Sequence, residues 1–154
     1  LCKDGDKYWH IDNIIKAYFL AWSMHGNIWK KDTKDWHSLK EKDIRFLKNI
    51  SSKIGHCPSV LYSISKLLTD IGSSYLNDEI GWISIILKNN KNLYADELES
   101  DTIFHIENLV RKYILQNNIE IKTKKVKKNE VLEILNFLIE KGSAVGYMLR
   151  ERIL

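Results

Sequence analysis

An amphipathic segment at residues 58–71, PSVLYSISKLLTDI, most constrains what this chain can fold into. Its apolar residues recur three and four positions apart, a spacing that places them on one face of an α-helix. Pro58 suits a first helical turn, and Gly72 suits the left-handed position after a helix end. We therefore predict a central helix with one buried face. Its apolar positions are Val60, Leu61, Ile64, Leu67, Leu68 and Ile71.

Apolar stripes of the same period recur along the chain and predict further helices. The chain has one proline and seven glycines, which are too few turn-forming residues for a sheet of many strands. The expected class is all-α, built as stacked antiparallel helical hairpins (an α-solenoid of HEAT-like type) or as an irregular bundle. No residue-level repeat decides between the two. The predicted helices cover residues 10–25, 41–54, 58–71, 75–87, 101–116, 129–141 and 143–153.

The segments between these helices are predicted from their breakers and charges. Residues 28–39 are predicted as a loop or short turn, residues 96–101 as an acidic linker, and residues 119–128 as a loop. Ser100 or Asp101 is a candidate cap for the helix that follows the linker. The connections before residue 58 and around Gly142 are short, which predicts two helical hairpins.

Length and composition favour a single folded domain over residues 1–154. Hydrophobic residues make up 44% of the 154, too many for a disordered chain. The chain begins with Leu1, so we expect a piece of a longer protein or a processed chain. No apolar run approaches the roughly 18 residues that cross a bilayer. Without such a run we expect no membrane partner. The two cysteines, Cys2 and Cys57, lack the spacing of a disulfide framework or a metal site, so we expect a cytoplasmic location.

A run of lysines is the first candidate site. Five lysines fall within seven residues, dense enough to neutralise phosphates. Arginine and interleaved aromatic residues, which would read or stack on bases, are missing from the run. The run is therefore a candidate polyanion or nucleic-acid site, against the plainer reading of a solvated connector. Its members are Lys122, Lys124, Lys125, Lys127 and Lys128.

Tryptophans provide the second candidate. Four of the five lie in the first 36 residues, and tryptophan is common both in cores and at interface hot spots. Trp22 falls on the stripe of helix 10–25 and is predicted to be core. Trp9, Trp29 and Trp36 are candidate protein-interaction residues, with burial as the alternative.

Catalytic and metal sites are not predicted. The histidines His10, His25, His37, His56 and His105 are scattered, and His56 beside Cys57 supplies two metal ligands at most. The chain contains no glycine-rich phosphate loop, nucleophile elbow or HExxH motif. We therefore expect no enzyme activity, no metal and no cofactor.

The segment GSAVGYMLRE at residues 142–151 is the most distinctive motif. Gly142 is predicted to close one helix and Ser143 to cap the next. Ala144 and Gly146 are small enough to let a neighbouring helix approach closely. Tyr147, with Leu149 or Arg150, is then predicted to pack across the hairpin.

This GSxxGYxLRE pattern resembles the C-terminal end of α-helical repeat regions in large bacterial proteins with a central NTPase module of the STAND or NACHT type, which act in anti-phage defence. The segments LLTDIGSSY and IGWISIIL add to the likeness, which covers about the last 95 residues. The resemblance implies a sensor or scaffold piece without catalytic residues. We thus expect a helical domain that recognises a protein partner or the rest of a larger chain, with polyanion binding by the lysine run as the alternative.

Overall fold

The structure, a computed structural model, describes residues 29–30, 35–36, 45, 49, 58–70 and 75–154. In this part of the chain the fold is all-α, as expected, apart from one pair of two-residue strands. The elements in chain order are β1 (Trp29–Lys30), β2 (Asp35–Trp36), α3 (Pro58–Asp70), α4 (Leu76–Asn89), the 3₁₀ helix η2 (Ala95–Glu97), α5 (Thr102–Thr123), α6 (Lys128–Glu140) and α7 (Ala144–Ile153).

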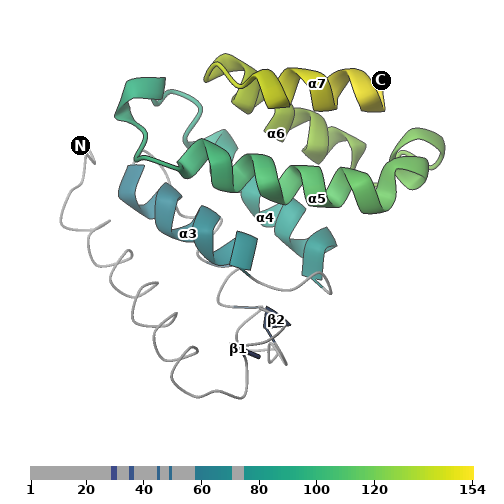
Figure 1. Cartoon of the computed structure of the whole chain (residues 1–154), viewed down its shortest axis with the longest axis horizontal. Helices are drawn as coiled ribbons and strands as arrows, with labels where there is room; N and C mark the ends of the chain where they lie inside the picture. Colours follow the sequence, from purple (N-terminus) through teal and green to yellow (C-terminus); the bar gives the residue numbers. More distant parts are fainter. Residues whose placement is uncertain (1–28, 31–34, 37–44, 46–48, 50–57, 71–74) are drawn as a thin grey trace.

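The five described helices lie in two layers. α5 packs against α3 on one side and α7 on the other, and α4 packs against α6. Each helix also packs against the one that follows it in the chain. Figure 1 shows α3, α5 and α7 in front and α4 and α6 behind, with α6 running opposite to α5 and α7. α5 therefore contacts all four other described helices.

One continuous hydrophobic cluster joins the two layers. α4, predicted as the helix at residues 75–87, contributes Ile80, Ile83, Ile86 and Leu87 to this cluster. The contributions of the other helices are Leu61, Ile64 and Leu68 from α3, Ile106, Leu109, Val110, Tyr113, Ile114 and Ile121 from α5, Val131, Ile134, Leu135, Phe137 and Leu138 from α6, and Leu149 and Ile153 from α7.

The central helix is confirmed as α3. It begins at Pro58, and its side chains at Leu61, Ile64 and Leu68 are fully buried. The residues predicted to end it, Ile71 and Gly72, lie outside the described residues. The sequence spacing alone therefore identified the buried face of this helix.

α5 corrects the prediction that a helix ends at Asn117 and that a loop follows. The helix continues to Thr123, and Asn117 forms only a bend, with φ −124° and ψ 19°. The Asn117 side-chain amide donates a hydrogen bond to the Tyr113 carbonyl, 3.0 Å away, which satisfies that group within the helix. Beyond the bend Ile121 reaches the core, and burial of this residue favours the helical continuation.

The start of α5 also differs from the expected cap. Asp101 occupies the position before the helix with a left-handed φ of 66°, and its side chain makes no capping hydrogen bond. Its main-chain carbonyl instead accepts a hydrogen bond from the His105 N–H at 2.9 Å. Ser100 is exposed and precedes this position. Asp101 therefore starts the helix through its main-chain conformation and carbonyl group, and its side chain does not act as a cap.

The α6–α7 hairpin is confirmed in its main features. Gly142 has a φ of 87°, and the Ser143 hydroxyl accepts a hydrogen bond from the Gly146 N–H at 2.8 Å. A Cβ on Gly146 would lie 2.8 Å from the Leu138 Cβ, so the close helix approach predicted here occurs at Gly146. Leu149 packs into the core as predicted.

Two residues of this motif were predicted wrongly. Ala144 is exposed and does not mediate the close approach, and Tyr147 is 57% exposed instead of packed across the hairpin. Both side chains lie on the side of α7 opposite to Gly146, Leu149 and Ile153, which face the core.

The N-terminal third is described at few positions. The helix predicted at residues 10–25, with Trp22, lies outside the described residues, and of the helix predicted at 41–54 only Arg45 and Asn49 are described, both helical. Within the predicted loop at 28–39, β1 and β2 pair antiparallel, with Trp29 opposite Trp36 and Lys30 opposite Asp35. This short ladder corrects the loop prediction for those four residues.

No helix among the described residues is long and apolar enough to cross a membrane.

Candidate functional site

Exposed apolar side chains gather on two neighbouring helices of the front layer. Six of the nine large hydrophobic residues that are exposed in the described part belong to α5, to α7 or to Leu154, which ends α7. All six are between 57% and 72% exposed, and the five that lie within the two helices define what we call the α5–α7 face. These are Phe104, Leu115 and Ile119 of α5 and Tyr147 and Met148 of α7.

The period of the α-helix, about 3.6 residues per turn, explains why the three residues of α5 share a surface. Phe104 and Leu115 are eleven residues apart, close to three full turns, and Leu115 and Ile119 are four apart. The opposite side of α5 carries Ile106, Val110 and Tyr113, which fill the core. α5 therefore has one wholly buried apolar stripe and a second, interrupted apolar stripe in solvent.

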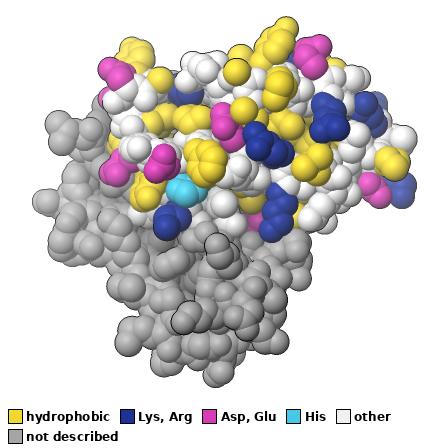
Figure 2. All heavy atoms as spheres, in the orientation of Figure 1, with side chains coloured by type: hydrophobic (Ala, Val, Ile, Leu, Met, Phe, Trp, Pro, Cys, Tyr) yellow, Lys and Arg dark blue, Asp and Glu magenta, His cyan; other side chains and the backbone are white. Residues whose placement is uncertain are grey.

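Basic residues are interspersed with this apolar surface. α5 and α7 together carry five basic residues, Arg111, Lys112, Lys122, Arg150 and Arg152, and three acidic ones, Glu107, Glu120 and Glu151. Glu107 is already engaged, since it accepts a hydrogen bond of 2.5 Å from the Ser143 hydroxyl. Figure 2 shows hydrophobic and basic side chains alternating across the part of the surface that α5 and α7 occupy. Arginine, aromatic residues and methionine are enriched in protein interfaces.

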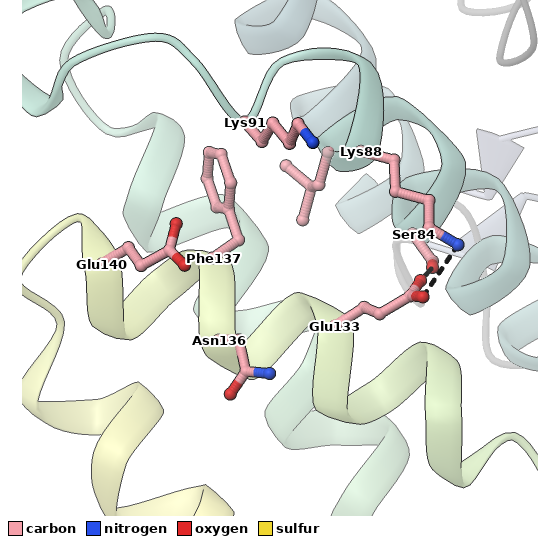
Figure 3. Close-up of a pocket in the computed structure, with 8 residues that line it drawn as sticks. Ser84, Lys88, Lys91, Glu133, Asn136, Phe137 and Glu140 are labelled. Carbon is pink, nitrogen blue, oxygen red and sulfur yellow. Dashed lines mark hydrogen bonds and ion pairs between the residues drawn. The ribbon is translucent and has the colours of Figure 1, made fainter.

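A pocket of about 150 Å³ lies between α4 and α6. We call it the α4–α6 pocket. It is smaller than most sites for drug-sized ligands, which span roughly 300–1,000 Å³. Its lining residues are Ser84, Leu87, Lys88 and Lys91 from α4 and the turn after it, and Glu133, Asn136, Phe137 and Glu140 from α6 (Figure 3).

One end of the pocket is closed by a polar clamp. The Ser84 hydroxyl donates a hydrogen bond of 2.6 Å to one Glu133 oxygen, and the Lys88 ammonium lies 2.8 Å from the other. Partial burial acts to raise the pKa of Glu133, but the hydrogen bonds from Lys88 and Ser84 and the Lys88 charge outweigh it and lower this pKa. A carboxylate with a lowered pKa is a poor general base, so this trio is better suited to joining α4 to α6 than to activating Ser84.

The other end of the pocket is apolar with lysines at its rim. Phe137 is 4% exposed and Leu87 is 2% exposed. The Lys141 ammonium lies 5.2 Å from the Phe137 ring centre and donates a hydrogen bond of 3.2 Å to the Lys91 carbonyl. In Figure 3 the Lys91 ammonium and the Glu140 carboxylate lie on opposite sides of the Phe137 ring.

The lysine run occupies the end of α5, the turn to α6 and the first residue of α6. Lys122, Lys124 and Lys125 are exposed, whereas Lys127 and Lys128 are partly buried. Lys127 forms an ion pair with Glu130 at 3.4 Å. Lys125 and Lys127 have left-handed φ values of 55° and 53°. The structure therefore brings the five candidates to one end of the helix stack but leaves three of them exposed.

The tryptophan candidates are only partly covered by the described residues. The backbones of Trp29 and Trp36 are paired across β1 and β2. Their side chains, and Trp9 altogether, lie outside what the structure describes. Their role in binding stays a prediction.

One buried carboxyl lacks a partner. Glu79 of α4 is fully buried, and neither of its oxygens has a hydrogen-bond partner among the described residues. Burial raises the pKa of Glu79 to about 9, with Lys112 lowering it and Asp78 raising it by smaller amounts. At neutral pH this side chain is therefore protonated.

Metal ligands do not cluster in the described part of the chain, where no group of three His, Cys, Asp or Glu side chains is placed to hold an ion. Among the five histidines of the chain, only His105 is described. Its ring lies 5.6 Å from that of Tyr62, and its carbonyl accepts a hydrogen bond from the Thr69 hydroxyl. It thus joins α5 to α3.

Sequence reasoning missed both the α5–α7 face and the α4–α6 pocket. A signal for the face was present, since Phe104, Leu115 and Ile119 fall off the buried stripe of their helix. No signal for the pocket exists in the spacing, because Ser84 and Glu133 are 49 residues apart and meet only through helix packing.

No protein-family model matches this chain, and no curated protein matches it in sequence.

Proposed function

We propose that this helical domain recognises a protein partner through the α5–α7 face and has no catalytic role of its own. The observation that carries the proposal is the exposure of Phe104, Leu115, Ile119, Tyr147 and Met148 on adjacent helices. Single exposed apolar residues are common, but a group of them on one face is typical of an interaction site.

The partner we propose is an acidic, amphipathic segment of another protein or of a longer chain that contains this domain. Basic residues exceed acidic ones on α5 and α7 by five to three, and Arg111 lies between Phe104 and Leu115 along α5. Complementary charge would steer the partner, and its apolar residues would cover the α5–α7 face.

The setting we propose follows from the resemblance of residues 142–151 to helical repeat regions of bacterial defence NTPases. The two-layer packing supports it, because helices that contact their next and next-but-one neighbours are typical of stacked helical hairpins. In this proposal the domain is a cytoplasmic α-solenoid piece of HEAT-like type, serving as sensor or scaffold.

Photo-crosslinking tests the recognition proposal. A photoreactive residue at Leu115 is expected to capture an acidic partner, while one at the exposed Asn92 is not. The captured protein is then purified and titrated against the chain. Leu115→Asp and Arg111→Glu should each weaken binding about ten-fold or more, with unchanged melting temperatures. Equal affinity of both variants and the parent would reject the α5–α7 face as the binding surface.

Polyanion binding is the second candidate, favoured by the exposure of Lys122, Lys124 and Lys125 at one turn without any ion pair among the described residues. If it occurs, affinity for duplex DNA or RNA should fall steeply with salt, because phosphate contacts release counterions. Replacing these three lysines with glutamine should reduce that salt slope. A gel shift without binding at ~50 mM salt would exclude this function.

A further inference from the structure

We propose that the α4–α6 pocket binds a carboxylate carried on a compact apolar body, as in an aromatic acid or the C-terminal residue of a peptide. The pocket lies on the rear layer, away from the α5–α7 face, so the inference is independent of the proposed function.

The size and floor of the pocket match a ring-sized apolar group. Leu87 and Phe137 are both nearly fully buried and supply an aliphatic and an aromatic surface. The pocket measures about 150 Å³, and a protein cavity of roughly 150 Å³ lined by apolar side chains can hold benzene. A planar ring can therefore enter beside Leu87 and Phe137, and contact with the Phe137 face requires that the Lys141 ammonium, 5.2 Å from the ring centre, moves aside.

The charges around this floor favour an anion. Two lysines, Lys88 and Lys91, and two glutamates, Glu133 and Glu140, line the pocket, and the Lys141 ammonium lies beside the Phe137 ring. Glu133 has both oxygens occupied, one by Ser84 and the other by Lys88. Lys91 has no ion pair among the described residues, and its ammonium is available to a ligand.

The remaining acid is placed away from the proposed carboxylate position. Figure 3 shows the Glu140 carboxylate across the Phe137 ring from the Lys91 ammonium. The side of the Phe137 ring that holds Lys91 is therefore more positive than the side that holds Glu140, which orients a ligand with its carboxylate toward Lys91. Lys141 holds the turn in place, since it donates a hydrogen bond to the Lys91 carbonyl.

Titration of the isotope-labelled chain with sodium benzoate, followed by nuclear magnetic resonance, tests the site. We expect saturable shifts of amide signals in residues 84–91 and 133–140, with a dissociation constant on the order of 1–10 mM for so small a ligand. Benzamide, which has the same ring without the charge, should bind at least about five-fold more weakly, since a partly exposed ion pair contributes about 1 kcal/mol. Equal binding of both compounds, or no saturable shift with benzoate, would overturn the proposal.

Charge variants make the assignment specific. Lys91→Met removes the ammonium but keeps most of the length of the side chain, and should weaken benzoate binding about five-fold. Glu140→Gln should strengthen it modestly, because a like charge at the rim is removed. Lys66→Met, at an exposed position of α3 outside the pocket lining, is the matched control and should leave benzoate binding unchanged. The proposed orientation requires that Lys91→Met weakens benzoate binding and that Glu140→Gln strengthens it. Any other pattern contradicts this orientation.

A comparison of N-acetylphenylalanine with benzoate separates the two sources of the carboxylate. Tighter binding of the acid than of benzoate would indicate a peptide C-terminus as the natural ligand. Weaker binding than benzoate would indicate a free aromatic acid, since the added backbone is then not accommodated.

Discussion

Two glycines at the start of α7 serve different purposes, and single substitutions separate them. Gly142 has a left-handed backbone with open space around its Cα, whereas Gly146 is pressed against Leu138. Gly146→Ala should lower the free energy of unfolding by about 1–3 kcal/mol through overpacking. Gly142→Ala should cost about 1 kcal/mol through backbone strain alone.

Thermal or urea unfolding of the two variants provides the measurement. Gly142→Asn is the control, because asparagine tolerates the left-handed region and should recover part of the loss. An equally small loss for Gly146→Ala would mean that α6 and α7 separate easily and that the close approach is not required.

The unpartnered Glu79 gives the chain a predictable dependence on pH. Its folded pKa of about 9 lies above the ordinary glutamate value of 4.5, so the folded state binds a proton that the unfolded state releases between these pH values. Stability should therefore fall as pH rises through this window and be unaffected by this group below it. Glu79→Gln removes the penalty and should stabilise the chain by up to about 3 kcal/mol at pH 7.

Urea unfolding of the parent and Glu79→Gln at pH 4 and pH 8 tests this effect. The two should have nearly equal stability at pH 4, and the variant should be the more stable at pH 8. Glu99→Gln is the matched control, at an exposed position outside the surroundings that shift the pKa of Glu79. A variant that is less stable than the parent at pH 8 would show that Glu79 is ionised and paired in the folded chain.

At the scale of elements, α5 is where local pattern and tertiary packing disagree. Asn117 and Asn118 are weak helix formers, and residues 119–123 alternate apolar and polar side chains, so the sequence favoured a loop. In the structure Ile121 is fully buried and Ile119 is 72% exposed, as expected for one helix turn against the core.

Alanine substitutions at these two positions test the continuation of α5. Ile121→Ala should cost about 2–5 kcal/mol because it leaves a cavity in a packed core, while Ile119→Ala should be close to neutral. Chemical denaturation of both variants gives the comparison. Equal, small effects would restore the loop prediction for this segment.

The other described helices could be predicted because each carries a buried stripe with a clear period. α3, α4, α6 and α7 begin and end within a few residues of their predicted bounds. The clamp of Ser84, Lys88 and Glu133 could not be predicted, since it depends on the register in which α6 packs on α4. Helix formation is local, but helix register is decided by packing of side chains from distant segments.

At the scale of the whole molecule, α5 is the element on which both layers meet. It contacts α3, α4, α6 and α7, and its buried residues include Val110, Tyr113 and Ile114. Tyr113 also joins α5 to α4, because its hydroxyl donates a hydrogen bond to the side-chain amide oxygen of Asn77 at 2.9 Å. The middle of α5 should therefore open only when the described helices unfold together.

Native-state hydrogen exchange tests this prediction. Amides of residues 109–114 should exchange with the free energy of global unfolding, and those of α7, at the edge of its layer, should exchange faster through local opening. The reverse order would show that α5 is not the centre of the cooperative unit.

What the sequence determined by itself is the helical class, the position of most helices and the side of each helix that is buried, because these depend on residue spacing within a few turns. What only the tertiary structure decided is which surfaces remain exposed, namely the second stripe of α5 beside Tyr147 and Met148 and the pocket over Phe137. It also decided that Glu79 is buried without a hydrogen-bond partner among the described residues. These depend on the order and register of the two layers. Residues far apart in the chain come together there, so no local pattern encodes them.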